Sequence, residues 1–203
     1  MTLKFPKELI LGGEEWKTQP FRFNVNAINT VQSLPEGYKK LDYLETKGSK
    51  NIKTNIVGNA RIVGQVQANI IKGSSSLLLA SAQGSPGGTW FGEALSTGKW
   101  GFSNAAGGYA NIPTTTKVNF DLSFDGAGAR GPVNGELISR SATVTQGNWM
   151  IFSSTSNTFY FTGKLFFLKF YQNNVLVGDF IPAQDPNNIT GLYDKVSKEF
   201  FRL

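Results

Sequence analysis

The 203-residue chain contains no cysteine and no histidine. Without cysteine it cannot form a disulfide, a thiolate nucleophile, a zinc–thiolate site or an iron–sulfur cluster. Without histidine it lacks the commonest general base and the commonest transition-metal ligand. A Ser-His-Asp triad is therefore excluded, and catalysis would need carboxylates, lysine, tyrosine or a Ser-Lys pair.

Long apolar runs and clusters of like charge are also missing. The stretch Leu9-Ile10-Leu11 is too short for a signal-peptide core, and no run approaches the about 20 apolar residues that cross a bilayer. The formal net charge is +6, but the basic residues are scattered and their longest run is Lys39-Lys40. Proteins that track phosphates usually cluster such residues. We expect neither a membrane nor a nucleic acid as partner, and the excess charge indicates a basic surface or attraction to an acidic partner.

The residues that are abundant favour β-structure. The chain has 23 glycines and 16 phenylalanines, and aromatic residues make up 13% of it. Aromatic side chains favour strands, and glycine suits the many turns between strands. Short apolar or alternating segments predict about a dozen strands and no long helix, which is typical of a sandwich or jelly roll. These segments are residues 41–46, 51–56, 62–70, 77–82, 90–92, 100–102, 117–125, 149–153, 159–161, 165–171, 175–181, 191–194 and 199–201.

The first 33 residues differ from the rest and predict an N-terminal arm. Their clearest feature is the alternating stretch Phe21-Arg22-Phe23-Asn24-Val25-Asn26-Ala27, which places Phe21, Phe23 and Val25 on one face of a strand. A lone strand needs a partner, which can be the domain itself, a neighbouring subunit or a larger assembly. Ser33-Leu34-Pro35-Glu36-Gly37 then interrupts the pattern. We expect an anchoring or oligomerisation arm over residues 1–33 and one domain over residues 34–203.

Two local patterns predict turns. Residues 126–131 match the dinucleotide-binding pattern G-x-G-x-x-G, but that mechanism needs a helix directly after the glycines. Pro132-Val133-Asn134-Gly135 follows instead, and Asn-Gly is the favoured pair of a type I′ hairpin. We therefore predict a β-hairpin and no nucleotide site. Residues 47–49 predict a second hairpin, which would pair residues 41–46 with 51–56, and Pro182 is expected to end a strand.

The acidic residues do not form a glycosidase pattern. Such an enzyme needs two carboxylates that face each other across the scissile bond. Asp121 and Asp125 share one face of their predicted strand, but no third acid accompanies them, and Asp42 with Glu45 forms another isolated pair. We expect no enzymatic activity and no catalytic residues, with a carbohydrate-active enzyme as the least favoured alternative.

The alternative chemistry is binding. Asp185-Pro186-Asn187-Asn188 is a loop rich in oxygen ligands with Asp179 nearby, so calcium is one hypothesis and an Asx turn without metal is the other. We expect no cofactor apart from this calcium alternative. Exposed aromatic rings beside loops are typical of glycan sites, and the candidates are Trp90, Trp100, Tyr109 and Trp149. Each of these can equally be a core residue at the end of a strand.

Three segments, one opening and two closing, resemble parts of a known domain family. The opening segment is LPEGYKKLDYLETKGSKNIKTNI at residues 34–56, and the closing segments are DFIP at 179–182 and GLYDKVSKEFF at 191–201. In this order they resemble the start and end of concanavalin A-like (laminin G-like) jelly-roll domains from structural proteins of tailed bacteriophages and prophages. Where the resemblance expects YIDTG, this chain has Asn51-Ile52-Lys53-Thr54-Asn55, which weakens any inference about a ligand at that place.

The resemblance implies an all-β, concanavalin A-like antiparallel sandwich with an extended N-terminal arm. It also implies a non-enzymatic component of the virion: a head or tail fibre, or a capsid decoration protein, whose partners are other virion proteins and copies of itself. The alternative is a receptor-recognition or adhesion module that binds a glycan of the host surface. It implies no catalytic residue.

Overall fold

The computed structural model describes residues 33–48, 50–69, 77–81, 89–93, 97–102, 108–125, 128–141, 147–153 and 160–203. The predicted arm, with Phe21, Phe23 and Val25, lies outside the described residues. The arm and its boundary at Ser33 therefore stay predictions, and the fold is that of the domain alone.

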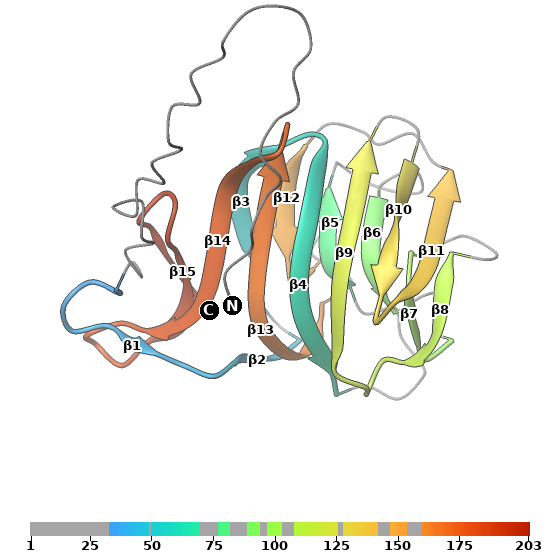
Figure 1. Ribbon diagram of the computed structural model, residues 1–203. Coiled ribbons are helices and arrows are strands. Elements are labelled where there is room, and N and C mark those ends of the chain that lie inside the picture. Colours follow the sequence, from blue (N-terminus) through green and yellow to red (C-terminus); the bar gives the residue numbers. More distant parts are fainter. Residues whose placement is uncertain are drawn as a thin grey trace, which may run out of the picture. The chain divides into compact units, whose positions relative to one another are not determined.

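The larger of two antiparallel sheets has ten strands (Figure 1). Its strands in spatial order are β11 (Glu136–Ser141), β10 (Gly128–Val133), β9 (Val118–Asp125), β4 (Ala60–Ala68), β13 (Thr162–Gln172), β14 (Val175–Gln184), β15 (Thr190–Asp194) and β16 (Phe200–Arg202). Two short strands join from the side: β1 (Lys39–Lys40) pairs with β14, and β2 (Leu44–Lys47) pairs with β13. The central strands β4, β9 and β13 alternate buried and exposed residues, so this sheet has one face in the core and one in solvent.

The smaller sheet has six strands. Their spatial order is β3 (Ile52–Val57), β12 (Asn148–Ile151), β5 (Leu77–Ser81), β6 (Thr89–Glu93), β7 (Lys99–Gly101) and β8 (Tyr109–Pro113). Across the described ranges, no helix is long and apolar enough to cross a membrane.

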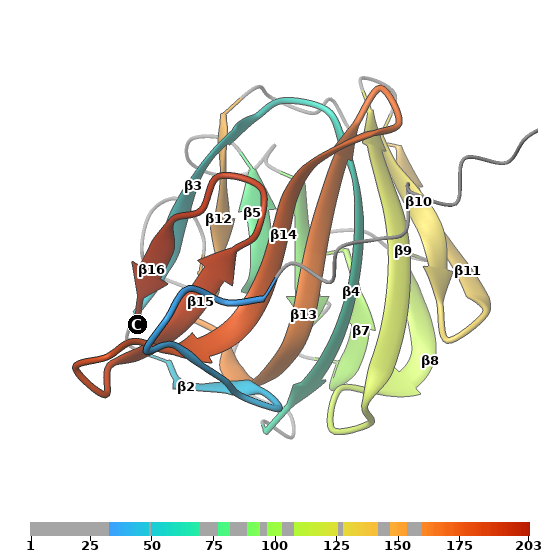
Figure 2. The same ribbon diagram turned by 60° about the vertical axis from the view of Figure 1, so that its left-hand side comes forward.

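Aromatic side chains join the two sheets into a sandwich. The ring centroids of Phe91 in β6 and Phe120 in β9 lie 4.8 Å apart, and so do those of Phe124 in β9 and Trp149 in β12. Tilted and edge-on ring pairs at such distances contribute about 0.5–1.5 kcal/mol each beyond the area they bury. Figure 2 shows the two layers from the side on which β14 and β15 lie. The predicted all-β class and antiparallel sandwich architecture are confirmed.

The predicted hairpin after the glycine-rich segment is also confirmed. β10 leads into β11 through Asn134 and Gly135, whose φ angles of 46° and 87° are those of a type I′ turn. Gly128 and Gly131 belong to β10 itself, and a strand rather than a helix follows them. The nucleotide-site pattern is therefore accidental.

The predicted pairing of residues 41–46 with 51–56 is wrong. β2 pairs with β13 in the larger sheet, whereas β3 pairs with β12 in the smaller one. Both strands carry buried residues on alternate positions, Leu44 and Thr46 in β2 and Ile52, Thr54 and Ile56 in β3. Each can therefore face the core from its own sheet, and alternation alone does not say which sheet a strand joins.

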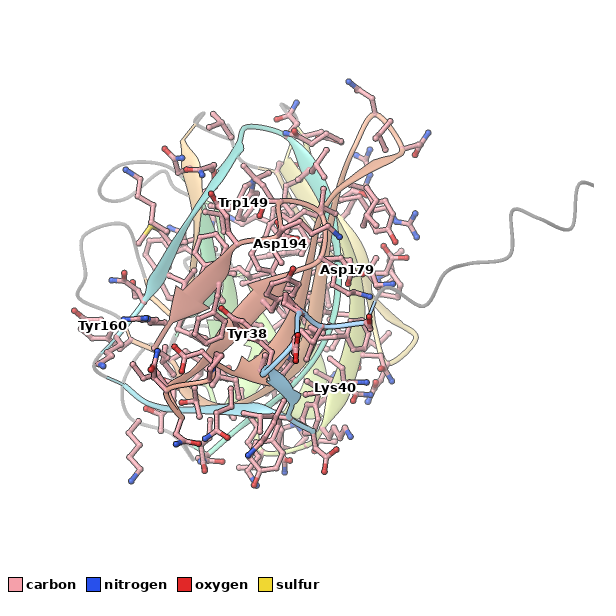
Figure 3. The ribbon with its side chains drawn as sticks, turned by 90° about the vertical axis from the view of Figure 1, so that its left-hand side faces the viewer. Tyr38, Lys40, Trp149, Tyr160, Asp179 and Asp194 are labelled. Carbon is pink, nitrogen blue, oxygen red and sulfur yellow. The ribbon has the colours of Figure 1, made fainter. Side chains whose placement is uncertain are left out.

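The opening and closing segments of the resemblance come together at the C-terminal end of the larger sheet. The Tyr38 ring lies 5.7 Å from that of Tyr193 and 5.4 Å from that of Phe200, over the β15–β16 hairpin (Figure 3). The Asp194 carboxylate accepts the backbone N–H groups of Asp179 at 2.8 Å and Val196 at 3.0 Å, which ties the closing turn to β14. These motif residues hold the fold together.

Pro182 does not end a strand, contrary to the prediction. β14 continues to Gln184, and the Pro182 carbonyl accepts the N–H of Leu41. In an extended strand the N and O of one residue point to the same side. The missing proline N–H therefore lies on the side of β14 that pairs with β13 and β1. It falls between the β13–β14 pair Leu168↔Phe180 and the β1–β14 pair Lys40↔Ala183. The ladder needs no donor there.

Candidate functional site

The solvent-facing side of the larger sheet carries a mixed polar and aromatic surface. Strand alternation places on it one set of residues from each of three adjacent strands. These are Arg61, Val63 and Gln65 of β4; Asn119, Asp121 and Ser123 of β9; and Phe167, Lys169 and Tyr171 of β13.

A hollow of about 320 Å³, which we name the outer hollow, lies on this face. This volume is at the lower end of the about 300–1,000 Å³ typical of small-ligand sites. Val63, Pro132 and Phe167 supply apolar walls, and the polar lining comes from Asn119, Asp121 and Asn134. An adjoining hollow of about 180 Å³, lined in part by Arg61, Ser123 and Tyr171, lies on the same face. Together they can hold a ligand that extends along the sheet.

Two backbone irregularities shape the outer hollow. A register shift in β13 between Leu165 and Phe167 leaves both Phe166 and Phe167 partly exposed, so an aromatic ring stands on the outer face. Gly131 in β10 has a φ of +151°, and a Cβ added there would lie 2.0 Å from the Asp121 carbonyl oxygen. Glycine therefore allows β10 to approach β9 beside the hollow.

An ion pair separates the two hollows. The Arg61 Nε and Nη2 atoms donate to the two Asp121 carboxylate oxygens at 2.7 and 2.6 Å. The hydrogen bonds and the negative charge of Asp121 raise the pKa of Arg61, which therefore stays charged at every working pH. The Arg61 guanidinium also lies 5.5 Å from the centroid of the Tyr171 ring. Two charges and one aromatic ring are thus held in a defined arrangement.

Amide side chains at the other end of the outer hollow are positioned in the same way. Gln65 Nε2 donates to Asn119 Oδ1 at 2.8 Å, and Asn134 Oδ1 accepts the backbone N–H of Asn119 at 2.8 Å. The Asn119 Nδ2 atom takes no part in these two bonds, and Asn119 lines the outer hollow, so it offers a donor to a ligand.

The two acidic residues that β9 places on this face are engaged in ion pairs. Asp121 pairs with Arg61, and Asp125 pairs with Arg130 at 2.8 Å. Each carboxylate thus has its own cationic partner, and the two do not form a coupled acid–base pair.

Two of the four predicted glycan contacts lie in the core, and for them the prediction is wrong. Trp100 and Trp149 are both 0% exposed. The Trp149 indole N–H donates to the Gly58 carbonyl at 2.9 Å, and that of Trp100 donates to the Thr116 carbonyl at 3.3 Å. Satisfying the indole N–H inside the protein lets these large rings fill the sandwich. The alternative, a core residue at a strand end, is what the structure shows.

Trp90 and Tyr109 are half-buried and stay candidates. They belong to β6 and β8 of the smaller sheet, on the side opposite the core residue Phe91. Lys99 Nζ lies 5.2 Å from the Tyr109 ring centroid and donates to Asn111 Oδ1 at 2.7 Å. They are on the outside of the other sheet, so the structure does not bring them together with the outer hollow.

The two calcium candidates have protein partners. Asp185 Oδ1 accepts the backbone N–H groups of Asn187 and Ile189, both at 2.9 Å, so the Asx turn is the interpretation that the structure supports. Asp179 Oδ2 pairs with Lys195 Nζ at 2.7 Å. In the described part of the chain, no three acidic residues gather as a metal site would require.

The residues of the outer hollow were not predicted as a site. The alternation of residues 117–125 indicates that Asn119 and Asp121 face solvent, but it does not say which strands lie beside them. Phe167 depends on the register shift in β13, for which the sequence carries no signal.

No family model matches the chain, and no curated protein is similar to it. Among solved structures, a similar chain is the Ruminococcus gnavus IT-sialidase CBM40 bound to α2,3-sialyllactose, with 14% sequence identity and a TM-score of 0.48. The similarity covers 69% of this chain and 92% of that one. A likeness of this size carries no information about the ligand of the present protein.

Proposed function

We propose that the domain is a non-enzymatic, lectin-like module that binds a glycan in the outer hollow. The observation that carries the proposal is the lining of the hollow: the Phe167 ring stands opposite amide and carboxylate groups that are held by hydrogen bonds. A sugar ring has apolar C–H faces and a rim of hydroxyls. An aromatic ring packs on such a face, while amides and carboxylates bind the hydroxyls.

Other ligand classes fit this surface less well. A nucleic acid would need clustered free cations, whereas Arg61 is already paired with Asp121. A purely apolar ligand would displace solvent from the remaining hydrogen-bonding positions of Asn119 and Asp121 and would supply no hydrogen bond in exchange. An oligosaccharide with two or more rings matches both hollows, because it is amphipathic and extended.

A second proposal concerns where the module acts. The opening and closing segments that resemble phage domains pack on each other through Tyr38, Tyr193 and Phe200. Residues far apart in the chain thus build one structural unit. We infer that the protein is a component of a tailed-phage virion, as a head or tail fibre or a capsid decoration, in which residues 1–33 contact other virion proteins or further copies of this chain.

The glycan proposal is tested by a glycan array with the full-length protein, followed by titration of each positive glycan against variants of the outer hollow. Phe167→Ala and Asn119→Ala are expected to weaken binding, and Leu137→Ala serves as control because Leu137 is 74% exposed and lies outside both hollows. A blank array contradicts the proposal. Turnover of the bound glycan that Asp121→Asn abolishes would contradict a non-enzymatic function.

The virion proposal is tested by deletion of residues 1–33. The shortened domain is expected to stay folded and to be absent from particles into which the full-length protein is incorporated. Loss of folding would show that the arm belongs to the core, and unchanged incorporation would show that another surface makes the attachment.

A further inference from the structure

Two lysines and two aromatic rings form a cluster beside the outer hollow, which we name the lysine–aromatic cluster. The ammonium group of Lys117 lies 3.8 Å from the centroid of the Phe166 ring, and that of Lys164 lies 4.3 Å from the centroid of the Tyr43 ring. The two ring centroids are 5.9 Å apart. The rings thus pack on each other with one cation held over each, which fixes where the two positive charges lie.

The cluster lies on the same face as the outer hollow, one step further along the sheet. Gln65 of β4 pairs with Asn119 of β9 on one side and with Phe167 of β13 on the other, so these three residues cross the face in one row. Asn119 and Phe167 line the hollow. Lys164 pairs with Gln67, the next outward residue of β4. Two residues of a strand span about 7 Å, so a ligand in the hollow can reach the cluster.

The register shift in β13 links the cluster to the hollow. The shift between Leu165 and Phe167 makes Phe166 an extra residue of the strand, and both phenylalanine rings are partly exposed. Phe167 lines the outer hollow, whereas Phe166 contacts a ring and an ammonium group of the cluster. One irregularity of the strand therefore places adjacent aromatic rings in two neighbouring sites.

The lysines of this face carry charge that is not neutralised by a close acid. None of Lys117, Lys164 and the outward-facing Lys169 forms an ion pair with any residue that the structure describes. The acid nearest in register is Glu45, which lies opposite Lys164 and whose Oε1 accepts Asn69 Nδ2 at 2.9 Å. Its single negative charge leaves the three lysines in excess, so this part of the face is positive.

We propose that the glycan of the outer hollow is acidic and that Lys117 and Lys164 bind its carboxylate or sulfate groups. The inference rests on the proposed function and adds the class of glycan to it. A lysine ammonium has three N–H donors, and a ring on one side of it leaves donors on the other side available to an anion. The sugar packs on Phe167, and its acidic substituent, or that of the next sugar, reaches the cluster.

A nucleic acid fits the cluster less well than an acidic glycan. Single strands are bound by rings that stack on the bases and by cations that follow the backbone. In the cluster each ring instead carries an ammonium group on its face, which obstructs the stacking of a base. The donors that remain suit an isolated anionic group.

Glycans that differ only in charge test the inference. Titration calorimetry of the full-length protein would compare a uronic-acid oligosaccharide with its carboxyl-reduced form, and a sulfated oligosaccharide with its desulfated form. We expect the charged member of at least one pair to bind more tightly, with an affinity that falls as the salt concentration rises. The pair that shows the difference identifies carboxylate or sulfate as the bound group.

Lysine variants show whether the cluster is responsible. Lys117→Gln and Lys164→Gln are each expected to weaken binding of the charged glycan about two- to fivefold and to leave binding of its neutral form unchanged. Lys117→Arg keeps the charge and should keep most of the affinity. Lys53→Gln is the control, because Lys53 is exposed on β3 of the smaller sheet and its replacement removes the same net charge.

Several outcomes would overturn the inference. If the charged and neutral forms bind equally, the outer hollow is a glycan site without an anion subsite, and the proposed function stands alone. Equal losses in Lys117→Gln and Lys53→Gln would assign the effect to net charge. A single-stranded oligonucleotide that binds more tightly than the acidic glycans, and that Lys117→Gln weakens, would assign the cluster to nucleic acid. Absence of binding to any glycan would contradict both the inference and the proposed function.

Discussion

Arg61 and Asp121 lie on adjacent strands and share two hydrogen bonds of 2.7 and 2.6 Å on the outer face of the larger sheet. Their side chains are 48% and 37% exposed. At such exposure an ion pair contributes at most about 1 kcal/mol to stability. The pair therefore contributes little to stability, and in the proposed function its role is to orient a guanidinium and a carboxylate between the two hollows.

Replacement of Arg61 should separate binding from stability. We expect Arg61→Gln to weaken glycan binding about three- to tenfold while the free energy of unfolding changes by less than about 1 kcal/mol. Titration calorimetry and urea unfolding measure the two quantities. Arg130→Gln is the matched control, because Arg130 also forms an exposed ion pair but lines neither hollow. Equal losses of binding in both variants would show that general charge, not this site, attracts the glycan.

Because Trp149 is buried, its replacement should lower stability and leave glycan binding unchanged, the reverse of the result expected for Arg61. Trp149→Phe removes the indole N–H that donates to the Gly58 carbonyl and leaves a smaller ring in the core. We expect the free energy of unfolding to fall by about 1–3 kcal/mol, because a buried carbonyl loses its donor and a void forms. Glycan affinity of the folded variant should be unchanged. A specific loss of affinity without loss of stability would restore Trp149 as a glycan contact.

The Asp194 carboxylate should be essential for the closing turn. It accepts the N–H groups of Asp179 and Val196 and, through Oδ2, that of Ser197 at 3.2 Å. Asp194→Ala leaves these donors unsatisfied, and we expect a loss of about 3 kcal/mol in urea unfolding. Ser197→Ala is the control, because its hydroxyl accepts only the exposed Glu199 N–H at 3.3 Å. A loss no larger than that of the control would contradict the structural role assigned to the motif.

Glu93 should make stability depend on pH. It is 2% exposed, its Oε1 accepts the Gly98 N–H at 3.0 Å, and within the described residues its Oε2 has no hydrogen-bond partner. Burial raises the pKa of Glu93 above its ordinary value of 4.5, although the bond from Gly98 opposes the shift. The folded state therefore favours the protonated acid. The stability that this provides is complete below pH 4.5 and is lost as the pH rises through the folded-state pKa.

Glu93→Gln mimics the protonated form at every pH. Thermal unfolding followed across a pH series should find this variant more stable than the wild type near neutral pH. The difference should shrink as the pH falls towards 4.5, the ordinary pKa value. A variant that is less stable than the wild type at neutral pH would show that the charged carboxylate is the favoured form.

The parts of the fold that local chemistry determines could be predicted from the sequence. Alternation identified the central strand of residues 117–125, and Asn134-Gly135 identified its hairpin, because side-chain period and φ preference act within a few residues. The partners of residues 41–46 and 51–56 could not be predicted, because alternation is the same whichever sheet a strand joins.

The site was harder to predict than the fold. Trp100 and Trp149 sit beside loops in the sequence but point into the core, and only the pairing of the sheets determines which way they face. Phe167 reaches the outer face because β13 shifts register after Leu165, and nothing in the local residues signals that shift. Asn119 and Asp121 could be assigned to a solvent face, but their neighbours Arg61 and Gln65 come from a strand more than fifty positions away.

The most direct test of the central claim is a comparison of glycan affinity for Phe167→Ala, Trp90→Ala and Tyr109→Ala, with a glycan that binds the wild type. If the outer hollow is the site, Phe167→Ala lowers the affinity about tenfold, a loss of about 1.4 kcal/mol, and the other two variants bind like the wild type. Affinity that is unchanged in Phe167→Ala but lost in Trp90→Ala or Tyr109→Ala would move the site to the smaller sheet and contradict the claim.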